Sequence, residues 1–504
     1  MHNIFLLRNK NNGLPWMCGL LWMWMLFACT SHPQEAPVCQ QQATSQPVIY
    51  PDYQGVTIPY NIAPLNFRIE TVGVEACYVT VVGEKGGEPL HVWGEKQVRF
   101  PEKAWHALLA ANQAALLHVQ VATRTGDQWT AWKPFTMQVS DRPIDSHLVY
   151  RLIEPGYEKW HIIGIYQRDL TTFEEEPIIR NDMVGYNCMN CHSFCLGDPQ
   201  QMLFHMRAAH GATYLWQAGS LQKLNTKTDQ TISNLTYPAW HPSGRYVTAS
   251  VNDIKQFFHA VKEKKMEVFD RASDVVVYDV KQKAILEEAS IITPDAFETF
   301  PAFSPDGKWL YFCTAPAREM PAHYAEMRYH LCRVSFDAEQ GSIHLPIDTL
   351  VRADRLSCTF PRISPDGRFL MYTETAYGQF PIWHTDAEIR MLDLSDGQSM
   401  DMSSLNSPDT ESYHSWSSGS DWVVVSSRRD NGLYTLPYLC AINREGRPGK
   451  PFLVPQENPN HYDDLLYSYN LPELVRGRVE LSPYQIQQTA IQAATPVVFR
   501  AKTN

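Results

Sequence analysis

The fold of this chain is decided by a short stretch, residues 300–310, with the sequence FPAFSPDGKWL. Residues 360–370 (FPRISPDGRFL) and residues 237–247 (YPAWHPSGRYV) have the same arrangement. Residues 413–423 (YHSWSSGSDWV) keep the aromatic positions but lack the Pro-Asp-Gly order. A self-similar segment that returns every ~50 to 60 residues is typical of folds built from repeated units.

Each copy has the pattern of two strands joined by a tight turn. Proline fixes φ and glycine tolerates positive φ, so Ser-Pro-Asp-Gly suits the turn, and apolar runs on either side suit the strands. A second hairpin follows each copy, as in residues 274–286, so that each repeat supplies a small antiparallel sheet. Counting these second hairpins gives six. We therefore predict an all-β protein built around a six-bladed β-propeller, a fold that protects its sheet edges.

The repeated element also resembles a known one. The order aromatic-Pro-x-apolar-Ser-Pro-Asp-Gly-Lys/Arg is similar to the WD40-like repeat of the TolB-like propellers, and residues 300–310 and 360–370 match it in full. The resemblance covers roughly residues 148–455. It implies a six-bladed propeller that serves as a protein-binding platform in the cell envelope. It implies no particular activity, because propellers host binding proteins and enzymes alike.

A smaller domain is expected before the propeller. Short alternating runs separated by Gly-rich turns predict a β-sandwich, and its last hairpin resembles that of a fibronectin type III or Ig-like module. One stretch, residues 103–115, is compatible with a helix. The predicted division of the chain is as follows: a signal peptide at 1–28, a flexible tether at 29–58, the sandwich at 59–142, the propeller at 148–470 with an insertion at 186–210, and a C-terminal extension at 471–504 with a helix at 483–494.

The N-terminus indicates export from the cytoplasm. Arg8 and Lys10 precede an apolar run that ends at Ala28 and is too short for a stable spanning helix. The run ends in LFAC, residues 26–29, which resembles the lipobox of bacterial lipoproteins. That resemblance implies cleavage before Cys29 and acylation of its thiol; a plain signal peptide or an uncleaved anchor is the alternative. The predicted location is the cell envelope, lipid-anchored to a bacterial membrane and mainly periplasmic.

Residues 186–192 (YNCMNCH) contain a Cys-x-x-Cys-His box, the attachment signature of a c-type haem. Cys188 and Cys191 would form thioethers with one haem c, and His192 would be the proximal axial ligand of its iron. Export supports this interpretation, because disulfides and c-type haem belong to compartments outside the cytoplasm. The candidates for the second axial position are His205 and His210, with Met202 and Met206 as further options.

The repeat register predicts where this box lies. Counting back from the copy at residues 237–247, Tyr186 or Cys188 would occupy the position of the opening aromatic residue. Residues 202–206 would then form the returning strand. The box would lie on the same rim as three long loops, at residues 251–273, 315–328 and 375–387, and long loops on one face of a scaffold are where function is usually placed.

The predicted function is electron transfer by a lipid-anchored, c-type cytochrome-like propeller with an envelope protein or redox partner. One alternative is a chance pentapeptide in a non-redox, TolB-like binding platform, with its cysteines in a disulfide or, together with Cys195, in a zinc site. Zinc ligands usually come from two separate knuckles, which favours haem. Another alternative is a haem enzyme with an open iron position.

Charge and the remaining motifs exclude some classes. The chain has 43 basic and 54 acidic side chains and a net charge of −11, so no nucleic-acid partner is expected. No Gly-rich phosphate loop, His-Glu-x-x-His box or nucleophile elbow is present. Cys313 and Cys332 fall in neighbouring predicted strands, where either a cross-strand disulfide or two separate buried thiols would fit. Cys39, Cys77, Cys358 and Cys440 have no assigned partner.

Overall fold

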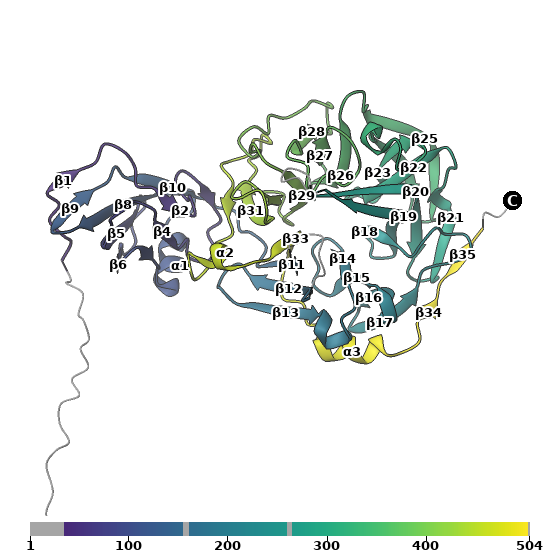
Figure 1. Ribbon diagram of the computed structural model, residues 1–504, viewed down its shortest axis with the longest axis horizontal. Coiled ribbons are helices and arrows are strands. Elements are labelled where there is room, and N and C mark those ends of the chain that lie inside the picture. The colour runs from purple at the N-terminus through teal and green to yellow at the C-terminus, as the bar shows by residue number, and fades with distance from the viewer. Residues whose placement is uncertain (1–34, 155–160, 260–264, 502–504) are drawn as a thin grey trace, which may run out of the picture. The chain divides into compact units, whose positions relative to one another are not determined.

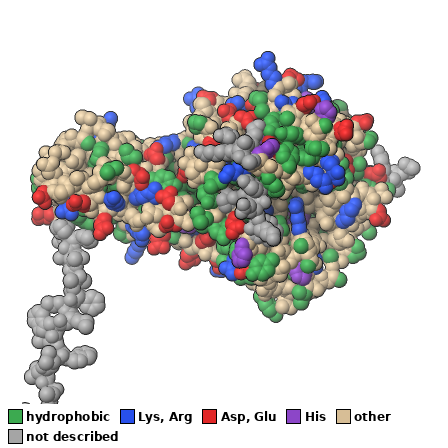
Figure 2. Space-filling view, viewed as in Figure 1, with side chains coloured by type: hydrophobic (Ala, Val, Ile, Leu, Met, Phe, Trp, Pro, Cys, Tyr) green, Lys and Arg blue, Asp and Glu red, His purple; other side chains and the backbone are tan. Residues whose placement is uncertain are grey.

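The computed structural model of this protein describes residues 35–154, 161–259 and 265–501. The regular secondary structure of the described chain is nearly all β-strand, with a few short helices (Figure 1). No helix among the described residues is long and apolar enough to cross a membrane. The predicted signal peptide and Cys29 lie outside the described residues. Acidic and basic side chains are interspersed over the face shown in Figure 2.

The N-terminal part consists of two sheets and a helix. The larger sheet has the order β1-β9-β8-β10-β3, with β5 paired to β8 and β6 to β5, and the smaller sheet has the order β2-β4-β7. Leu117, Val119 and Val121 alternate along β8 and share one hydrophobic core with Trp105 of α1. The elements are β1 Gln41–Gln42, β2 Ile49–Tyr50, β3 Thr57–Ile58, β4 Phe67–Ile69, β5 Ala76–Gly83, β6 Leu90–Gly94, β7 Gln97–Val98, α1 Glu102–Ala111, β8 Ala115–Thr125, β9 Gln128–Ala131 and β10 Phe135–Val139.

Two details of this part bear on the sequence-based expectations. Helix α1 lies almost entirely within the stretch expected to be helical. Strands β1, β2 and β3 fall in the range expected to be a tether, and they pair with β9, β4 and β10.

Six further sheets follow one another along the chain. Within each sheet the strands pair antiparallel in chain order, while β33 from near the C-terminus pairs with β11 of the first of these sheets. Their strands are β11 His147–Ile153, β12 Gly164–Asp169, β13 Glu175–Arg180 and β33 Ser468–Val475; β14 Met189–Phe194, β15 Gln201–Met206, β16 Ala212–Gln217 and β17 Ser220–Asn225; β18 Thr236–Trp240, β19 Tyr246–Phe258, β20 Met266–Asp279 and β21 Ala284–Ile291; β22 Ala296–Phe303, β23 Trp309–Pro316, β24 His330–Asp337 and β25 Ser342–Val351; β26 Ser357–Ile363, β27 Phe369–Thr375 and β28 Glu388–Asp393; β29 Glu411–Trp416, β30 Trp422–Ser427, β31 Leu436–Ala441 and β32 Phe452–Leu453.

The C-terminal residues return to sheets formed earlier in the chain. Beyond β33, helix α3 (Pro483–Ala490) packs against β13 and β17. Strands β34 (Thr495–Pro496) and β35 (Val498–Arg500) then add parallel edges to β17 and β21. The remaining short helices are η1 Asn181–Val184, η2 Ala208–His210, η3 Tyr324–Glu326 and α2 His461–Asp464.

The repeated element forms the predicted strand, turn and strand. Ser304 Oγ donates to Asp306 Oδ1 at 2.5 Å and accepts the Trp309 amide at 3.0 Å. Ser364 makes the equivalent pair of bonds in the next copy. Gly307 has φ +72°, a conformation that side chains rarely adopt, which explains why the turn needs glycine. The turn prediction is confirmed in these copies.

A bulge in the first strand of each repeat was not predicted. The register of β18 shifts between Thr236 and Ala239, and β22 and β26 shift at the equivalent point. The bulged residues Tyr237, Phe300 and Phe360 have φ of 49°, 48° and 53°. Positive φ is uncommon for such residues and is tolerated where the surrounding structure demands it. A bulge redirects a side chain, so these aromatic rings leave the regular alternation of their strands.

The same bulge locates the Cys-x-x-Cys-His box and corrects its predicted register. Strand β14 shifts between Asn190 and Ser193, and Cys191 has φ 54°. Cys191, rather than Tyr186 or Cys188, therefore occupies the position of the opening aromatic residue. His192 stands where residues 237–247, 300–310 and 360–370 have proline and where residues 413–423 have His414. Residues 189–206, within the range expected to be an insertion, form the ordinary strands β14 and β15.

Candidate functional site

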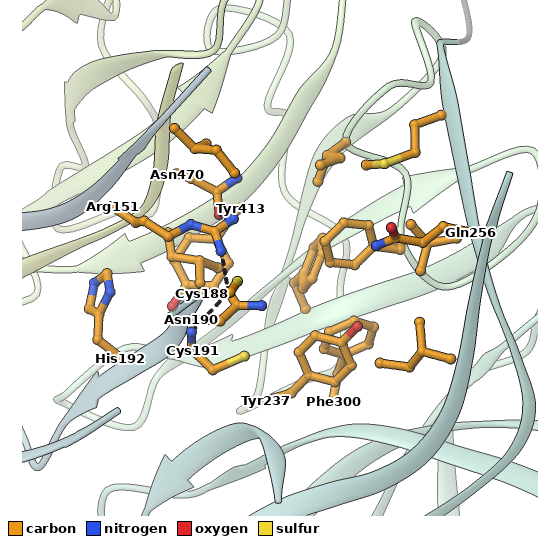
Figure 3. Close-up of a pocket in the computed structure, with 18 of the residues that line it drawn as sticks. Arg151, Cys188, Asn190, Cys191, His192, Tyr237, Gln256, Phe300, Tyr413 and Asn470 are labelled. Carbon is orange, nitrogen blue, oxygen red and sulfur yellow. Dashed lines mark hydrogen bonds between the residues drawn. The ribbon is translucent and has the colours of Figure 1, made fainter. Parts of the chain in front are cut away.

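The candidate site is a cavity of about 280 Å³ that is lined by residues from all six sheets (Figure 3). The bulged first strands converge on it, and the long hairpin of β19 and β20 closes one side. Its side chains divide into an aromatic wall, three arginines, and the thiols of the Cys-x-x-Cys-His box. The main contributors from the six sheets are Arg151, Cys191, Tyr237, Phe300, Phe360, Tyr413 and Leu471.

The aromatic wall is a continuous row of rings that meet tilted or edge to face. The ring centroids of Tyr237 and Phe300 are 4.2 Å apart, and those of Phe300 and Phe360 are 4.5 Å apart. The ring centroids of Phe360 and Tyr413 are 5.8 Å apart. Phe380 packs against the rings of Tyr237, Phe300 and Phe360. Rings at these distances attract one another beyond the area they bury. They form an apolar surface on one side of the cavity.

Arg151, from β11, faces this wall from the opposite side (Figure 3). Arg151 is only 9% exposed. Nη1 donates to Asn190 Oδ1 at 2.7 Å, and Nη2 donates to Asn470 Oδ1 at 3.0 Å, while Nε has no partner among the described residues. Burial lowers the pKa of Arg151, because the charged form loses its hydration. A buried guanidinium held by neutral amides is an incompletely compensated positive charge.

Two more arginines line the cavity. Arg207 follows β15 and is exposed at the edge. Arg362, on β26, donates from Nη2 to the Tyr413 hydroxyl at 3.3 Å. In the part of the chain that the structure describes, no carboxylate pairs with Arg151, Arg207 or Arg362, and no Asp or Glu lines this cavity. The cavity is therefore apolar with a positive potential.

A second cavity of about 370 Å³ adjoins this one, and Arg362 and Tyr413 line both. The Tyr413 hydroxyl donates to Glu473 Oε1 at 3.2 Å, and Glu473 Oε2 accepts the Phe194 amide at 3.0 Å. Burial raises the pKa of Glu473 to about 7, although Arg362 acts in the opposite direction. Glu473 is thus linked to Arg362 through the Tyr413 hydroxyl, and it lines the second cavity.

The two thiols of the box belong to the first cavity. Cys188 is half-buried and Cys191 is buried. Burial raises the pKa of Cys191, so its thiol stays protonated near neutral pH, although Arg207 and Arg151 favour the thiolate. Cys188, Cys191 and Cys195 are free thiols. The cross-strand disulfide considered for Cys313 and Cys332 is absent, and both are buried thiols.

The histidines do not gather around the thiols. Figure 3 shows His192 set apart from the Cys191 sulfur, on the side away from the aromatic rings. Both ring nitrogens of His192 are buried without a hydrogen-bond partner among the described residues, and burial lowers its pKa to about 3. His205 and His210 do not line this cavity. Met202 and Met206, on β15, are buried in a hydrophobic core that also contains residues of β14 and β16.

No family model matches the chain, and no curated protein sequence is similar to it. Solved structures are similar to it at low identity. A puromycin-hydrolysing peptidase of Mycobacterium tuberculosis is 13% identical over 80% of this chain and 57% of that one, with a TM-score of 0.34. A puromycin hydrolase is 13% identical over 63% and 54%, with a TM-score of 0.37. A DUF4784 family protein of Bacteroides caccae is 9% identical over 72% and 96%, with a TM-score of 0.30. The chain spans little more than half the length of the two hydrolases.

The predictions of a TolB-like protein, of haem c and of electron transfer are wrong. No family model matches the chain, and the solved structures named above are two puromycin hydrolases and a DUF4784 family protein. Among the described residues, no group of three or more His, Cys, Asp or Glu side chains could hold a metal ion. The local reason is the bulge in β14, which directs Cys191 towards the cavity and leaves His192 in its wall. Of the proposed ligands, His192 lines the cavity that holds both thiols, whereas His205 and His210 do not.

The two alternative hypotheses, a TolB-like binding platform and a haem enzyme, are not supported either. A TolB-like binding platform with a structural cysteine cluster is not supported, because Cys188, Cys191 and Cys195 are free, and Cys195 instead donates to the His241 carbonyl at 3.5 Å. The haem-enzyme hypothesis requires a bound haem and is therefore rejected as well. Sequence reasoning missed Arg151, Arg207 and Arg362, which carry no motif. The aromatic residues that open the repeats were the signal that could have identified the aromatic wall of the site.

Proposed function

We propose that this protein binds a small organic anion with an aromatic or similarly flat apolar body in the cavity of Figure 3. The observation that carries the proposal is the pairing of an aromatic wall with Arg151, a buried guanidinium without a carboxylate partner among the described residues. Binding sites of this kind are mostly apolar and use a few polar groups to fix the orientation of the ligand. The ring stack would take the flat body, and the arginines would take the anionic group.

A carboxylate is the anion that suits this geometry best. Guanidinium and carboxylate form paired, charge-assisted hydrogen bonds, and these are stronger than neutral ones. Arg151 already has three neutral acceptors, the side chains of Asn190 and Asn470 and the Met189 carbonyl, so its Nε–H is the donor that remains for a ligand. Hydrogen bonds to charged groups contribute about 1.5–3 kcal/mol, which corresponds to roughly ten- to hundredfold in affinity.

We further propose that the six sheets are the blades of a six-bladed β-propeller and that the two N-terminal sheets form a β-sandwich. The succession of six antiparallel sheets supports the first, as does the pairing of β33 with β11, which joins the end of the array to its beginning. The convergence of the six bulged strands on one cavity would then be the propeller axis. Acylation of Cys29 and a lipid-anchored location in the cell envelope also stay proposals of ours, supported by the sequence at residues 14–29.

Calorimetry with two matched probes tests the binding proposal. The purified chain is titrated with 2-naphthoate and with 2-naphthamide, which share the flat body and differ in charge. We expect 2-naphthoate to bind at least tenfold more tightly. Arg151→Gln and Arg207→Gln should each reduce that difference. Arg124→Gln, a substitution of an exposed arginine in β8, is the matched control and should leave it unchanged.

Arg207→Gln protects the test against misfolding of Arg151→Gln, because the Arg207 side chain is exposed and makes no buried hydrogen bonds among the described residues. Equal affinities for the two probes, or no binding of either, would contradict the proposal.

A further inference from the structure

A third cavity, of about 720 Å³, lies beside the aromatic one and has received no role so far. Asn190, Cys191, Arg207 and Ile254 line both, so the two cavities share a wall. The rest of its lining comes from β15 and its following turn and from the segments around β18 and β19. In contrast to the aromatic cavity, this side cavity is rich in amides and hydroxyls, among them Asn234, Thr236 and Asn252.

His205 is the buried polar group in its wall. The side chain is only 5% exposed, and its Nε2 atom has no hydrogen-bond partner among the described residues. Burial lowers the pKa of His205 to about 3, so the ring is neutral near pH 7. Of its two ring nitrogens, one must then carry a proton and the other must be an acceptor.

A chain of hydroxyl groups determines which nitrogen carries the proton. Thr226 Oγ1 donates to Asn234 Oδ1 at 3.3 Å, which uses the only hydroxyl proton of Thr226. Thr213 Oγ1, at 3.1 Å from Thr226 Oγ1, must therefore be the donor in that contact. The Thr213 oxygen, at 3.0 Å from His205 Nδ1, must then accept the Nδ1 proton.

The consequence is that His205 Nε2 has a lone pair and no donor. A buried acceptor without a partner costs free energy, and a ligand that supplies a donor would recover it. A cationic donor is disfavoured, because the Arg207 guanidinium lines the same cavity. Asp253 would not offset this, because Arg271 and Lys255 already pair with it.

We infer that the side cavity is a second subsite, which takes a neutral hydrogen-bond donor, an amide N–H or a hydroxyl, attached to the anionic ligand of the aromatic cavity. This inference rests on the proposed binding function and extends it to a two-part ligand. The flat body lies on the ring stack, the anionic group meets the arginines, and the donor arm passes the shared wall to reach His205.

Two ligands that differ only in the arm test this inference. 3-(2-Naphthyl)propanoate has the flat body and the carboxylate. N-Acetyl-3-(2-naphthyl)alanine has both and adds an acetamido N–H. Calorimetry on the purified chain should show at least fivefold tighter binding of the acetylated compound. Equal or weaker binding of that compound would overturn the inference, whereas binding of neither compound would overturn the proposed function itself.

Variants at His205 assign any gain to the side cavity. His205→Leu should remove the advantage of the acetylated compound and leave the affinity for 3-(2-naphthyl)propanoate unchanged. His205→Gln keeps a polar atom near the position of Nε2 and should retain part of the advantage. An undiminished advantage in a folded His205→Leu protein, verified by its thermal denaturation, would also overturn the inference. The comparison of the two ligands on the unaltered chain remains decisive if that variant does not fold.

Discussion

Replacing Glu473 by Gln should strengthen anion binding at alkaline pH and flatten its dependence on pH. Glu473 is linked to Arg362 through the Tyr413 hydroxyl, by hydrogen bonds of 3.2 and 3.3 Å. Burial raises the pKa of Glu473 to about 7, so its charge changes across the neutral range. When ionised, Glu473 offsets the charge of Arg362 and repels an anion in the aromatic cavity. Protonation removes both effects, so affinity should rise as the pH falls from 8 to 6.

The magnitude follows from Coulomb's law. At an effective dielectric constant of about 20, two unit charges roughly 10 Å apart repel each other by about 1–2 kcal/mol, which we take as the repulsion between Glu473 and the bound anion. That corresponds to roughly a five- to thirtyfold change in affinity for 2-naphthoate. The other groups that face Glu473 do not titrate in this window: the pKa of Tyr413 is raised well above its usual value, and that of Arg362 is raised by Tyr413 and Glu473.

The assay is calorimetry of 2-naphthoate binding at pH 6, 7 and 8. Glu473→Gln should bind at pH 8 about as tightly as the unaltered protein binds at pH 6. Asp270, whose pKa burial also raises to about 7, is a second source of pH dependence near Tyr237, and Asp270→Asn measures its share. A Glu473→Gln protein with the same pH profile as the unaltered protein would refute the reasoning, and so would affinity that falls towards pH 6.

Three further predictions concern the wall, the thiols and the anchor. Phe300→Ala removes a ring from the centre of the stack, so we expect the free energy of unfolding to fall by about 3–5 kcal/mol and 2-naphthoate affinity to fall with it, as measured by urea denaturation and calorimetry. Iodoacetamide should label Cys188 faster than the buried Cys191, and 2-naphthoate should slow that labelling, which peptide mass spectrometry would follow; no protection would contradict the placement of the ligand. Cys29→Ser should abolish incorporation of labelled palmitate and release the protein from membranes, and unchanged incorporation would contradict acylation at Cys29.

The strands and turns of the repeats were predictable because their chemistry is local. Residues 300–310 encode a turn in which Ser304 and Asp306 bond to nearby backbone and Gly307 adopts positive φ, and none of these features depends on distant residues. Alternating apolar residues in the N-terminal part likewise identified strands. The pairing of β33 with β11 was not foreseen, because a contact between the end and the beginning of an array leaves no periodic signal.

The site was not predictable to the same degree. A Cys-x-x-Cys-His pentapeptide specifies residue order, whereas the direction of each side chain depends on the bulge at Cys191 and His192. The arginines carry no motif at all: Arg151, Arg207 and Arg362 come from three different sheets or their edges and meet only in the folded chain. The hydroxyl chain that fixes the proton of His205 also joins two strands and a loop, and it cannot be inferred from spacing.

The asymmetry of the cavity has its origin in departures from the repeat. Four sheets place an aromatic ring at or next to the bulge, namely Tyr237, Phe300, Phe360 and Tyr413. The remaining two positions are Cys191 and Leu471, which have no ring and which flank the amides that hold Arg151. An aromatic ring at either position would compete with the guanidinium for space in the cavity. The two positions without a ring thus make room for a charge opposite the aromatic wall, and a ligand with one flat end and one anionic end is the shape that uses both halves.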